Sequence, residues 1–341
     1  MRVSIVGDIS FQDIPIDQFK ISDSVQRLLG ASSLNIGNLE SVISSSLPPI
    51  ANHPVHLRGP YSAVKLMTSF HLLSLANNHI QDYGSEGVEA TELALNQAGL
   101  FFSGLGKDIN EASNPFTTEI DGEKVAVFCV SRFCRAGHGI KGTPGDSSYN
   151  LFSQIRTLCK KGYFVIVFFH WGIEYTWFVQ PESQRMAKEF IEAGASVIFG
   201  GHSHRIQPIQ RFSKGMAYYS MGNFLFPDFM LKSPLTIYYP EGFSMNDAYT
   251  LPVLNKYAPV SVPSLRVWPN LSRIGLIAEL QICNHCIKIR QRMVRIKRQS
   301  SELDLYPRLL TRIYRAWLWL FSIIIRLPVY SWFYCKMLRL S

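Results

Sequence analysis

The sequence predicts an α/β protein with a largely parallel sheet, and two observations lead to this fold class. Short runs of β-branched and apolar residues alternate along the chain with amphipathic stretches, which is the pattern of repeated strand–helix–strand units. The chain has 341 residues, of which 47% are hydrophobic and 17% are charged. This is enough apolar material for the core of one large or two ordinary domains, which excludes a largely disordered chain.

Proline and glycine indicate where helices begin and end. Pro60 is expected to precede a helix over residues 62–69, and Gly99 and Gly194 are expected to end helices over residues 88–98 and 181–193. Between the helices we expect strands over residues 3–6, 33–36, 72–75, 124–130, 164–169, 196–199 and 217–220. Residues 227–272 are rich in Pro, Tyr and Ser with little periodicity, which is typical of an insertion or long loop that could act as a lid.

The six cysteines are too few and too scattered for a disulfide framework, so a reducing compartment is expected. Cys283 and Cys286 form a single Cys-x-x-Cys pair, which could supply half of a zinc site. No second pair follows it, and alternating apolar runs lie on both sides. We therefore interpret the pair as the turn of a closing β-hairpin over residues 274–297.

The positive charge of the chain is concentrated toward its C-terminal end. The 34 Lys and Arg residues exceed the 25 Asp and Glu residues, which gives a net charge of +9. Residues 288–341 hold twelve of the basic residues and two of the acidic ones, so the preceding part is almost neutral. A nucleic-acid-binding protein carries its basic residues over a face of the folded body. This distribution instead favours an anionic membrane surface, and no nucleic-acid partner is expected.

Residues 299–341 are expected to form a membrane-interacting tail, separate from a domain over residues 1–298. A helix beginning near Pro307 would carry Arg312 and Arg315, with Arg308, on a different side from its apolar residues. The apolar residues are Leu309, Leu310, Ile313, Trp317, Leu320, Phe321 and Ile324. Such a basic amphipathic helix lies in the membrane interface.

Two alternatives for this helix remain. It could dock on the body of the protein or on a partner subunit, or a short tilted span could use the apolar runs around Arg326 and Pro328. Neither run reaches the ~20 residues needed to span a bilayer. At the other end of the chain, the apolar run over residues 3–6 is too short for a secretory signal peptide. We therefore expect a cytoplasmic protein that is peripheral at the inner face of the membrane.

Polar residues follow five of the predicted strands, at the point where each strand ends. They are Asp8; Asn38 and Glu40; Asn77, Asn78 and His79; His170; and His202 and His204. Ligands of an open α/β sheet bind at the carboxyl ends of its strands, so the five clusters are expected to converge on one site. This mixed oxygen and imidazole set suits Mn, Fe or Zn better than Mg or Ca.

Some of these residues, taken alone, have a structural explanation. An aspartate after a strand, such as Asp8, is often a turn former, and a single histidine, such as His170, is often hydrogen-bonded in the core. His202 and His204 are harder to explain in this way, because alternation across one residue of a glycine-rich turn brings both imidazoles to one side. The set as a whole therefore predicts a divalent transition metal.

Six motifs contain or surround these residues. They are GDI at 7–9, NLES at 38–41, SLANNHIQDYG at 74–84, HWGIEY at 170–175, GGHSHRIQPI at 200–209 and YSMGNFLF at 219–226. In this order they resemble the CapA-type poly-gamma-glutamate capsule synthesis proteins, a branch of the calcineurin-like metallophosphoesterases. The resemblance covers residues 1–226 and implies a four-layer fold, in which two mixed sheets pack face to face with helices outside, and a two-metal site at the strand ends.

The resemblance implies that Glu40 bridges two metals and that Asp8 and His204 bind the first of them. Members of the superfamily carry Asp-x-His at the first strand, whereas this chain has Ser10 in place of the His. The first metal therefore lacks one imidazole ligand and is expected to bind weakly.

The second metal is expected to bind tightly, because the resemblance gives it a complete ligand set in which Asn78, His170 and His202 join Glu40. The adjacent His79 matches the residue that assists the leaving group. Two metals would clamp the attacking and leaving oxygens of a phosphoryl displacement, so a weak first metal weakens the case for catalysis. Further residues expected to line the site are Asn38, Asn77, Trp171, Glu174 and Asn223.

Two functions are compatible with these residues and with the resemblance. The chain could be a metal-dependent hydrolase of a phosphoester or a related ester or amide bond, with His79 as general acid and Arg205 or Arg132 on the substrate anion. It could instead be a non-catalytic component of capsule or exopolymer synthesis or export that binds an acidic polymer or membrane-bound partner subunits. The resemblance favours a role with poly-gamma-glutamate or another anionic polymer, and the sequence leaves open whether the chain is an enzyme.

Overall fold

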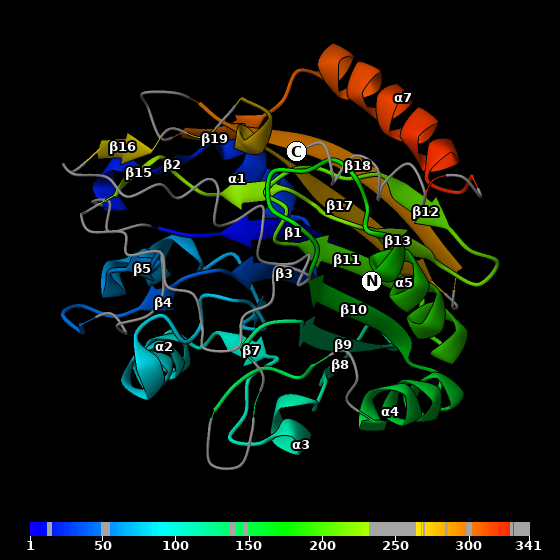
Figure 1. Ribbon diagram of the computed structural model, residues 1–341, viewed down its shortest axis with the longest axis horizontal. Coiled ribbons are helices and arrows are strands. Elements are labelled where there is room, and N and C mark those ends of the chain that lie inside the picture. The colour runs from blue at the N-terminus through cyan, green and yellow to red at the C-terminus, as the bar shows by residue number, and fades with distance from the viewer. Residues whose placement is uncertain are drawn as a thin grey trace.

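The protein's computed structural model consists of two β-sheets packed face to face, with helices on their outer faces (Figure 1). The structure describes residues 1–11, 16–48, 55–134, 136, 141–145, 149–231, 264–266, 268, 270–283, 286–297, 302–327 and 330. Most of the expected insertion over residues 227–272, and the last residues of the expected tail, lie outside these described residues.

The first sheet has nine strands and is mixed. Its strands in order are β2 (Lys20–Ile21), β19 (Glu302–Leu305), β18 (Cys286–Ile296), β17 (Ile274–Cys283), β1 (Arg2–Ile9), β3 (Leu34–Leu39), β6 (Leu72–Ser74) and β7 (Phe101–Ser103), and β14 (Asn223–Leu225) also pairs with β1. The strands from β1 to β7 in this order are parallel, whereas β17 runs antiparallel to β1. β17 and β18 form the hairpin expected around Cys283 and Cys286, which oppose each other in register.

The second sheet has six strands with a parallel centre. Its strands in order are β12 (Ile209–Arg211), β13 (Met216–Tyr218), β11 (Val197–Gly201), β10 (Phe164–His170), β9 (Glu123–Ser131) and β8 (Phe116–Ile120). The edge strands β12 and β8 are antiparallel to their neighbours. Two short pairs lie outside the main sheets, β4 (Val42–Ile43) with β5 (Arg58–Gly59) and β15 (Phe229–Leu231) with β16 (Ser264–Arg266).

Helices lie between the strands and cover the sheets. The α-helices are α1 (Asp23–Gly30), α2 (Gly84–Gln97), α3 (Ile109–Ala112), α4 (Tyr149–Lys160), α5 (Pro181–Ala193) and α7 (Arg308–Ile324), and the 3-10 helices are η1 (Ile16–Gln18), η2 (Tyr61–Leu66) and η3 (Asn270–Arg273). Pro60 precedes the short 3-10 helix η2 rather than an α-helix over residues 62–69, because the backbone N–H groups of Ala63 and Met67 bond to carbonyls three residues earlier instead of four. α1 and α4 are not among the predicted helices, although Ser22 caps α1 with its side chain.

Three apolar layers hold the sheets and helices together. The central layer lies between the two sheets, where Ile5 and Ile36 of the first sheet share a buried cluster with Phe168 and Phe199 of the second. A second cluster joins the first sheet to α1 and α2, and a third joins the second sheet to α4 and α5. The helix–sheet–sheet–helix order confirms the α/β four-layer sandwich with two mixed sheets.

The segment expected to form a separate tail is integrated into the sandwich where the structure describes it. β19 pairs with β18 and β2 in the first sheet. Leu318 of α7 belongs to the central apolar cluster, and Ile325 belongs to the cluster under α4 and α5. No helix among the described residues is long and apolar enough to cross a bilayer. The division at residue 298 therefore does not separate two independent cores.

Two glycines let backbone segments approach closely beside the polar strand ends. A Cβ on Gly7 would lie 1.8 Å from the carbonyl oxygen of Gly222, and a Cβ on Gly200 would lie 2.0 Å from that of Tyr219. The backbone of residues 219–222 thus runs against β1 and β11 with no room for a side chain. The close approach of these backbone segments positions Asp8, which follows Gly7, and His202, which comes two residues after Gly200.

We predict that Gly200→Ala lowers the free energy of unfolding by about 1–3 kcal/mol or more, because the added methyl group would meet backbone atoms rather than a flexible side chain. Gly30→Ala is the matched control, since no atom lies within 4 Å of a Cβ there. Urea unfolding of both variants measures the two free energies. Equal stabilities for Gly200→Ala and the parent would contradict the close approach.

Candidate metal centre

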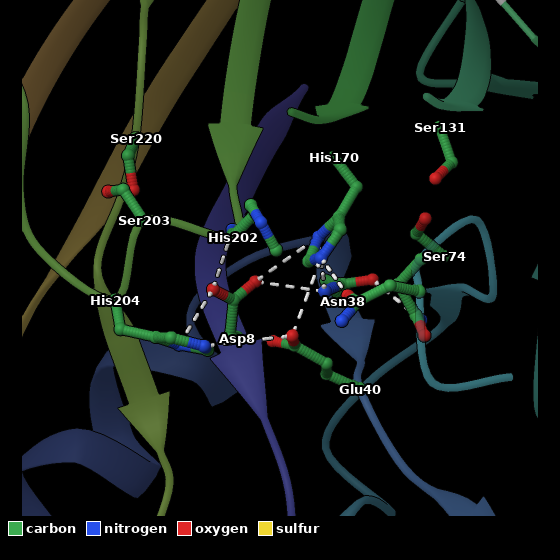
Figure 2. Close-up of polar contacts among 12 residues, drawn as sticks. Asp8, Asn38, Glu40, Ser74, Ser131, His170, His202, Ser203, His204 and Ser220 are labelled. Carbon is green, nitrogen blue, oxygen red and sulfur yellow. Dashed lines mark hydrogen bonds and ion pairs between the residues drawn. The ribbon is translucent and has the colours of Figure 1, made fainter. Parts of the chain in front are cut away.

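The polar strand ends of both sheets meet at one place (Figure 2). Asp8 lies in β1 and Asn38 in β3, and Glu40 follows β3 directly. His170 is the last residue of β10, and His202 follows the end of β11. Asp8, Asn38, Glu40, His170, His202 and His204 are all buried. The convergence expected from the sequence is therefore present in the structure.

The Asp8 carboxylate is held by donors from both sheets. Its Oδ1 accepts a hydrogen bond from Asn38 Nδ2 at 2.8 Å, and its Oδ2 accepts one from the backbone N–H of His202 at 3.0 Å. His204 Nδ1 lies 3.7 Å from Oδ2. Because these partners lie on β3 and after β11, Asp8 joins the two sheets at their polar edge.

Glu40 lies between two imidazoles. Its Oε1 is 3.4 Å from His170 Nε2 and 3.8 Å from His204 Nε2. Two sets of potential ligand atoms within 4.8 Å of one another share this carboxylate: Glu40 with His170 and His202, and Glu40 with Asp8 and His204. These are the side-chain groupings that the resemblance assigns to the second and first metals.

Asn77 and Asn78 come from the turn after β6 and support the centre from one side. Asn78 Oδ1 lies 2.8 Å from His170 Nε2, the nitrogen that also faces Glu40. Asn77 donates to the backbone oxygen of Leu39 at 2.8 Å and accepts from the backbone N–H of His79 at 3.0 Å. Asn78 is thus placed to add an amide oxygen to the set of Glu40 and His170, and Asn77 fixes the turn.

His202 and His204 are placed by an unusual backbone conformation. Both have positive φ, at 82° and 51°, which costs a residue with a side chain on the order of 1 kcal/mol or more. Their turn follows Gly200 and Gly201, and His204 Nδ1 is fixed by Asn223 Oδ1 at 2.9 Å. In this backbone conformation both imidazoles lie close to the Asp8 carboxylate, beside Glu40 (Figure 2).

Burial sets the charges of the centre. It raises the pKa of Asp8 to about 7, and it raises the pKa of Glu40 well above its ordinary value, with a further increase from Asp8. Burial also lowers the pKa of His170 and of His202 well below the ordinary value, and that of His204 to about 3. The imidazoles are therefore neutral at pH 7 and have lone pairs available for a metal.

The residues fit a divalent metal. Among the described residues, no hydrogen-bond donor or acceptor is paired with either carboxylate oxygen of Glu40 or with Nδ1 of His202, and all three atoms are buried. A buried carboxylate without donors is costly, and the raised pKa of Glu40 means that a proton offsets this cost in the metal-free protein; a bound cation would take the place of that proton. The donor set of carboxylate, imidazole and amide groups suits Mn, Fe or Zn. Ser10, which stands in place of the superfamily histidine, is also buried, and its Oγ has no partner in the part of the chain that the structure describes.

His79 lies beside the centre and is paired with Asp82. His79 Nδ1 is 2.7 Å from Asp82 Oδ2, which also accepts from the backbone N–H of Leu57. Burial lowers the pKa of His79 to about 3. The Asp82 contact holds the imidazole in one orientation, which a residue that transfers a proton requires.

The remaining predicted site residues differ in their surroundings. The Arg205 guanidinium lies half-buried over the Trp177 ring, 5.1 Å from its centroid, with Nε unpartnered in the described structure. Glu174 is buried close enough to raise the pKa of Glu40. Arg132 forms an ion pair with Glu182 at 2.9 Å, so its positive charge is already paired with a carboxylate of the chain.

Trp171 lies in the apolar core behind the metal centre and does not line the centre as predicted. Its ring stacks on Phe169 at 4.2 Å, and its Nε1 donates to the backbone oxygen of Tyr219 at 2.8 Å. It belongs to the apolar cluster of the second sheet and is 1% exposed. Strand alternation explains this difference from the prediction, since His170 faces the centre and its neighbour faces the opposite side.

Several aromatic residues around the centre were not predicted. The Phe133 ring lies 4.5 Å from the His202 ring. Phe226 and Trp268 lie 5.1 and 5.0 Å from His204. Phe133 follows the end of β9, so the strand-end rule could have found it. No sequence signal indicates Trp268, which comes from a segment distant in the chain.

Comparisons with known proteins agree with the family resemblance. Residues 2–228 match the family model described as "Bacterial capsule synthesis protein PGA_cap". The capsule biosynthesis protein CapA of Bacillus anthracis is 34% identical over 186 residues, which cover 52% of this chain and 45% of that protein. The PGA biosynthesis protein CapA of Bacillus subtilis (strain 168) is 28% identical over 240 residues, which cover 66% and 63%. The matches thus span less than two thirds of the length of these relatives.

One solved structure similar to this chain is that of a 5'-nucleotidase from Candida albicans SC5314. The sequence identity is 17% and the TM-score is 0.40, over 65% of this chain and 45% of that chain.

We predict that His170→Ala and His202→Ala each lower the bound transition metal from about one per chain to below about a tenth, because each removes a ligand of the more complete set. His204→Ala should keep most of the metal. Elemental analysis of protein purified without chelator measures this, with His71→Ala as the control at the opposite end of β6. Complete loss of metal in His204→Ala would invert the assignment of the two sets.

The affinity for metal should rise with pH. Below about pH 7 a metal must displace the proton of Asp8 in one ligand set, and in both sets it must displace the proton of Glu40, whose pKa is raised well above its ordinary value; the three imidazoles are already neutral. Raising the pH removes the competing proton, so affinity should increase by at least about tenfold per unit from about pH 5 up to pH 7. Calorimetric titrations in buffers of different ionisation enthalpy measure the affinity and the protons released. An affinity constant across this range, with no proton release, would contradict the protonated carboxyl.

Proposed function

The chain belongs to the PGA_cap family of bacterial capsule synthesis proteins, and from this premise we propose that it is a metal-dependent component in the synthesis or export of an anionic polymer of the poly-gamma-glutamate type. We further propose that the centre formed by Asp8, Glu40 and the three histidines hydrolyses a phosphoester or a related bond in that process. The centre would hold one tight divalent metal and a second, weaker one.

The observation that carries this proposal is the position of Glu40. Its carboxyl group is buried beside Asp8, receives no hydrogen bond from an N–H donor of the described residues, and faces imidazole nitrogens of His170 and His204. A purely structural acid in the core would be paired with hydrogen-bond donors. A carboxyl group that is shared by two sets of neutral imidazole ligands would instead suit a cation in either set. When bound, such a cation lowers the pKa of coordinated water and polarises a phosphoryl oxygen.

The residues of the chain would bind and orient the substrate. His79, aligned by Asp82, is the candidate proton donor to the leaving oxygen. Arg205 is the candidate partner of the substrate anion, because its Nε lacks a partner in the described structure and its guanidinium is supported by Trp177. Phe133 covers His202 and helps to exclude water from that side.

A second function, binding of an acidic polymer without turnover, is favoured by two observations. Ser10 replaces one imidazole ligand of the first metal. Burial also leaves His79 neutral at pH 7 in the metal-free protein, so the group would not hold the proton that a general acid donates. A chain that keeps the metal fold as a binding or assembly component would need neither group.

We predict that His79→Ala reduces metal-dependent hydrolysis of a generic phosphodiester or phosphomonoester by about 10² to 10⁴-fold, the usual contribution of a general acid, while the bound metal is retained. Activity is measured with added Mn, Fe or Zn, and metal content by elemental analysis. His71→Ala controls for loss of a histidine elsewhere. If the parent protein and His79→Ala both hydrolyse at the uncatalysed rate with metal bound, the non-catalytic function replaces the hydrolase.

A further inference from the structure

Within the described part of the chain, helix α7 packs on the body through one side. Leu318 is 2% exposed in the central apolar cluster, and the Trp317 ring lies 5.5 Å from that of Trp177. Phe321 meets Phe178 at 6.4 Å. These contacts place the helix at the edge of the molecule beside β12 and β18 (Figure 1). Three residues of the apolar face predicted from the sequence therefore lie on the inner side of the helix. They are Trp317, Phe321 and Ile324.

The outward side of α7 is also apolar. Leu309 is 68% exposed and Leu320 is 51% exposed. The exposed apolar residues that recur at alternating spacings of four and three are Leu309, Ile313, Ala316, Leu320, Ile323 and Leu327. This outward stripe runs the length of the helix. Large apolar residues exposed in so regular a row are typical of a surface that contacts something other than water.

A groove with three arginines lies on the flank of the helix. It has a volume of about 190 Å³ and is lined by Arg211, Arg315, Arg326, Tyr218, Leu318 and Trp319, among others. A liquid water molecule occupies about 30 Å³, so the groove has room for a phosphate group with its substituents. Trp319, beside the groove, is 66% exposed.

The arginines of the groove have no acidic partner in the described part of the chain. None of the described lining residues is Asp or Glu. Arg326 donates to the backbone oxygen of Ser322 at 2.8 Å, which orients the guanidinium without neutralising it. α7 itself contains Arg312 and Arg315 but no acid. The groove is thus an uncompensated positive site next to an apolar stripe.

We propose that α7 is a docking surface for anionic phospholipid, in which the outward stripe enters the membrane interface and the groove of Arg211, Arg315 and Arg326 binds a lipid phosphate. An amphipathic helix lying in the interface buries its apolar side at the boundary of headgroups and acyl chains. The arginines then lie at the depth of the phosphates. This proposal concerns a site separate from the metal centre and does not rest on the proposed hydrolysis.

The charges favour a lipid surface over a second copy of the chain. A symmetric pairing of two α7 helices along the stripe would bring Arg312 and Arg315 of both copies near one interface, and the helix offers no acid to pair with them. Like charges at such an interface are destabilising. An anionic membrane supplies the missing negative charge along the whole flank.

The test uses the full chain and vesicles. The parent protein should sediment with vesicles of phosphatidylglycerol and phosphatidylcholine, and not with vesicles of phosphatidylcholine alone. Leu320→Glu should weaken partitioning by at least about tenfold, because it places a charge in the apolar stripe. Leu93→Glu is the matched control, since Leu93 is a 54% exposed leucine on α2. Circular dichroism and the unfolding temperature check that both variants are folded.

The role of the groove is tested with a double variant that removes two of its positive charges. Arg315→Gln combined with Arg326→Gln should weaken partitioning by about 25-fold, about fivefold for each arginine near an anionic surface. The control is Arg185→Gln on α5, which removes an exposed arginine elsewhere.

Three outcomes would overturn the proposal. One is equal vesicle binding by the parent and all α7 variants. Another is a dimer, seen by sedimentation of the parent without lipid, that Leu320→Glu converts to a monomer, because the stripe would then bind a second copy. The third is binding of inorganic phosphate in the groove by a protein that does not bind either vesicle, which would make the groove a site for a soluble anion.

Discussion

The carboxylates of Asp8 and Glu40, buried side by side where the two sheets meet, impose the constraint on which the rest of the structure depends. Burying a carboxylate is expensive unless donors or a cation compensate it. Asp8 obtains donors from Asn38 of the first sheet and from the backbone of His202 after the second. Glu40 has none in the described structure. Both sheets must therefore end at the same place, and the glycines at 7 and 200 allow the backbone of residues 219–222 to pass close by.

The surroundings of the centre make it both dry and rigid. Phe133 covers His202, and Phe226 and Trp268 surround His204. In a low-dielectric site an unpaired charge is costly and a paired one is strongly held. The same property that would make a bound cation tight keeps the imidazoles neutral. A tight cation alone is compatible with either turnover or binding, so proton transfer by His79 is the step that distinguishes the two proposed functions.

Helix α7 shows how tertiary packing changes the meaning of an amphipathic pattern. The sequence pattern groups Leu309, Trp317, Leu320 and Phe321 on one apolar side. In the fold, Trp317 and Phe321 pack against the segment around Trp177, whereas Leu309 and Leu320 face outward. The helix is apolar over more than half of its circumference, so periodicity alone does not show which part the body covers. Trp177 also supports Arg205, so the helix rests on the segment that carries a candidate substrate residue.

The sequence alone determined the α/β class, the strand ends that carry the centre and the motif order of the family, because each depends on local pattern and on the rule that ligands gather at the carboxyl ends of strands. Only the tertiary structure decided which side chains take part. It placed Trp171 in the core, paired Arg132 with Glu182 and brought Trp268 beside His204. These outcomes depend on contacts between residues far apart in the chain, and on which face of a strand or helix its neighbours cover, neither of which local periodicity contains.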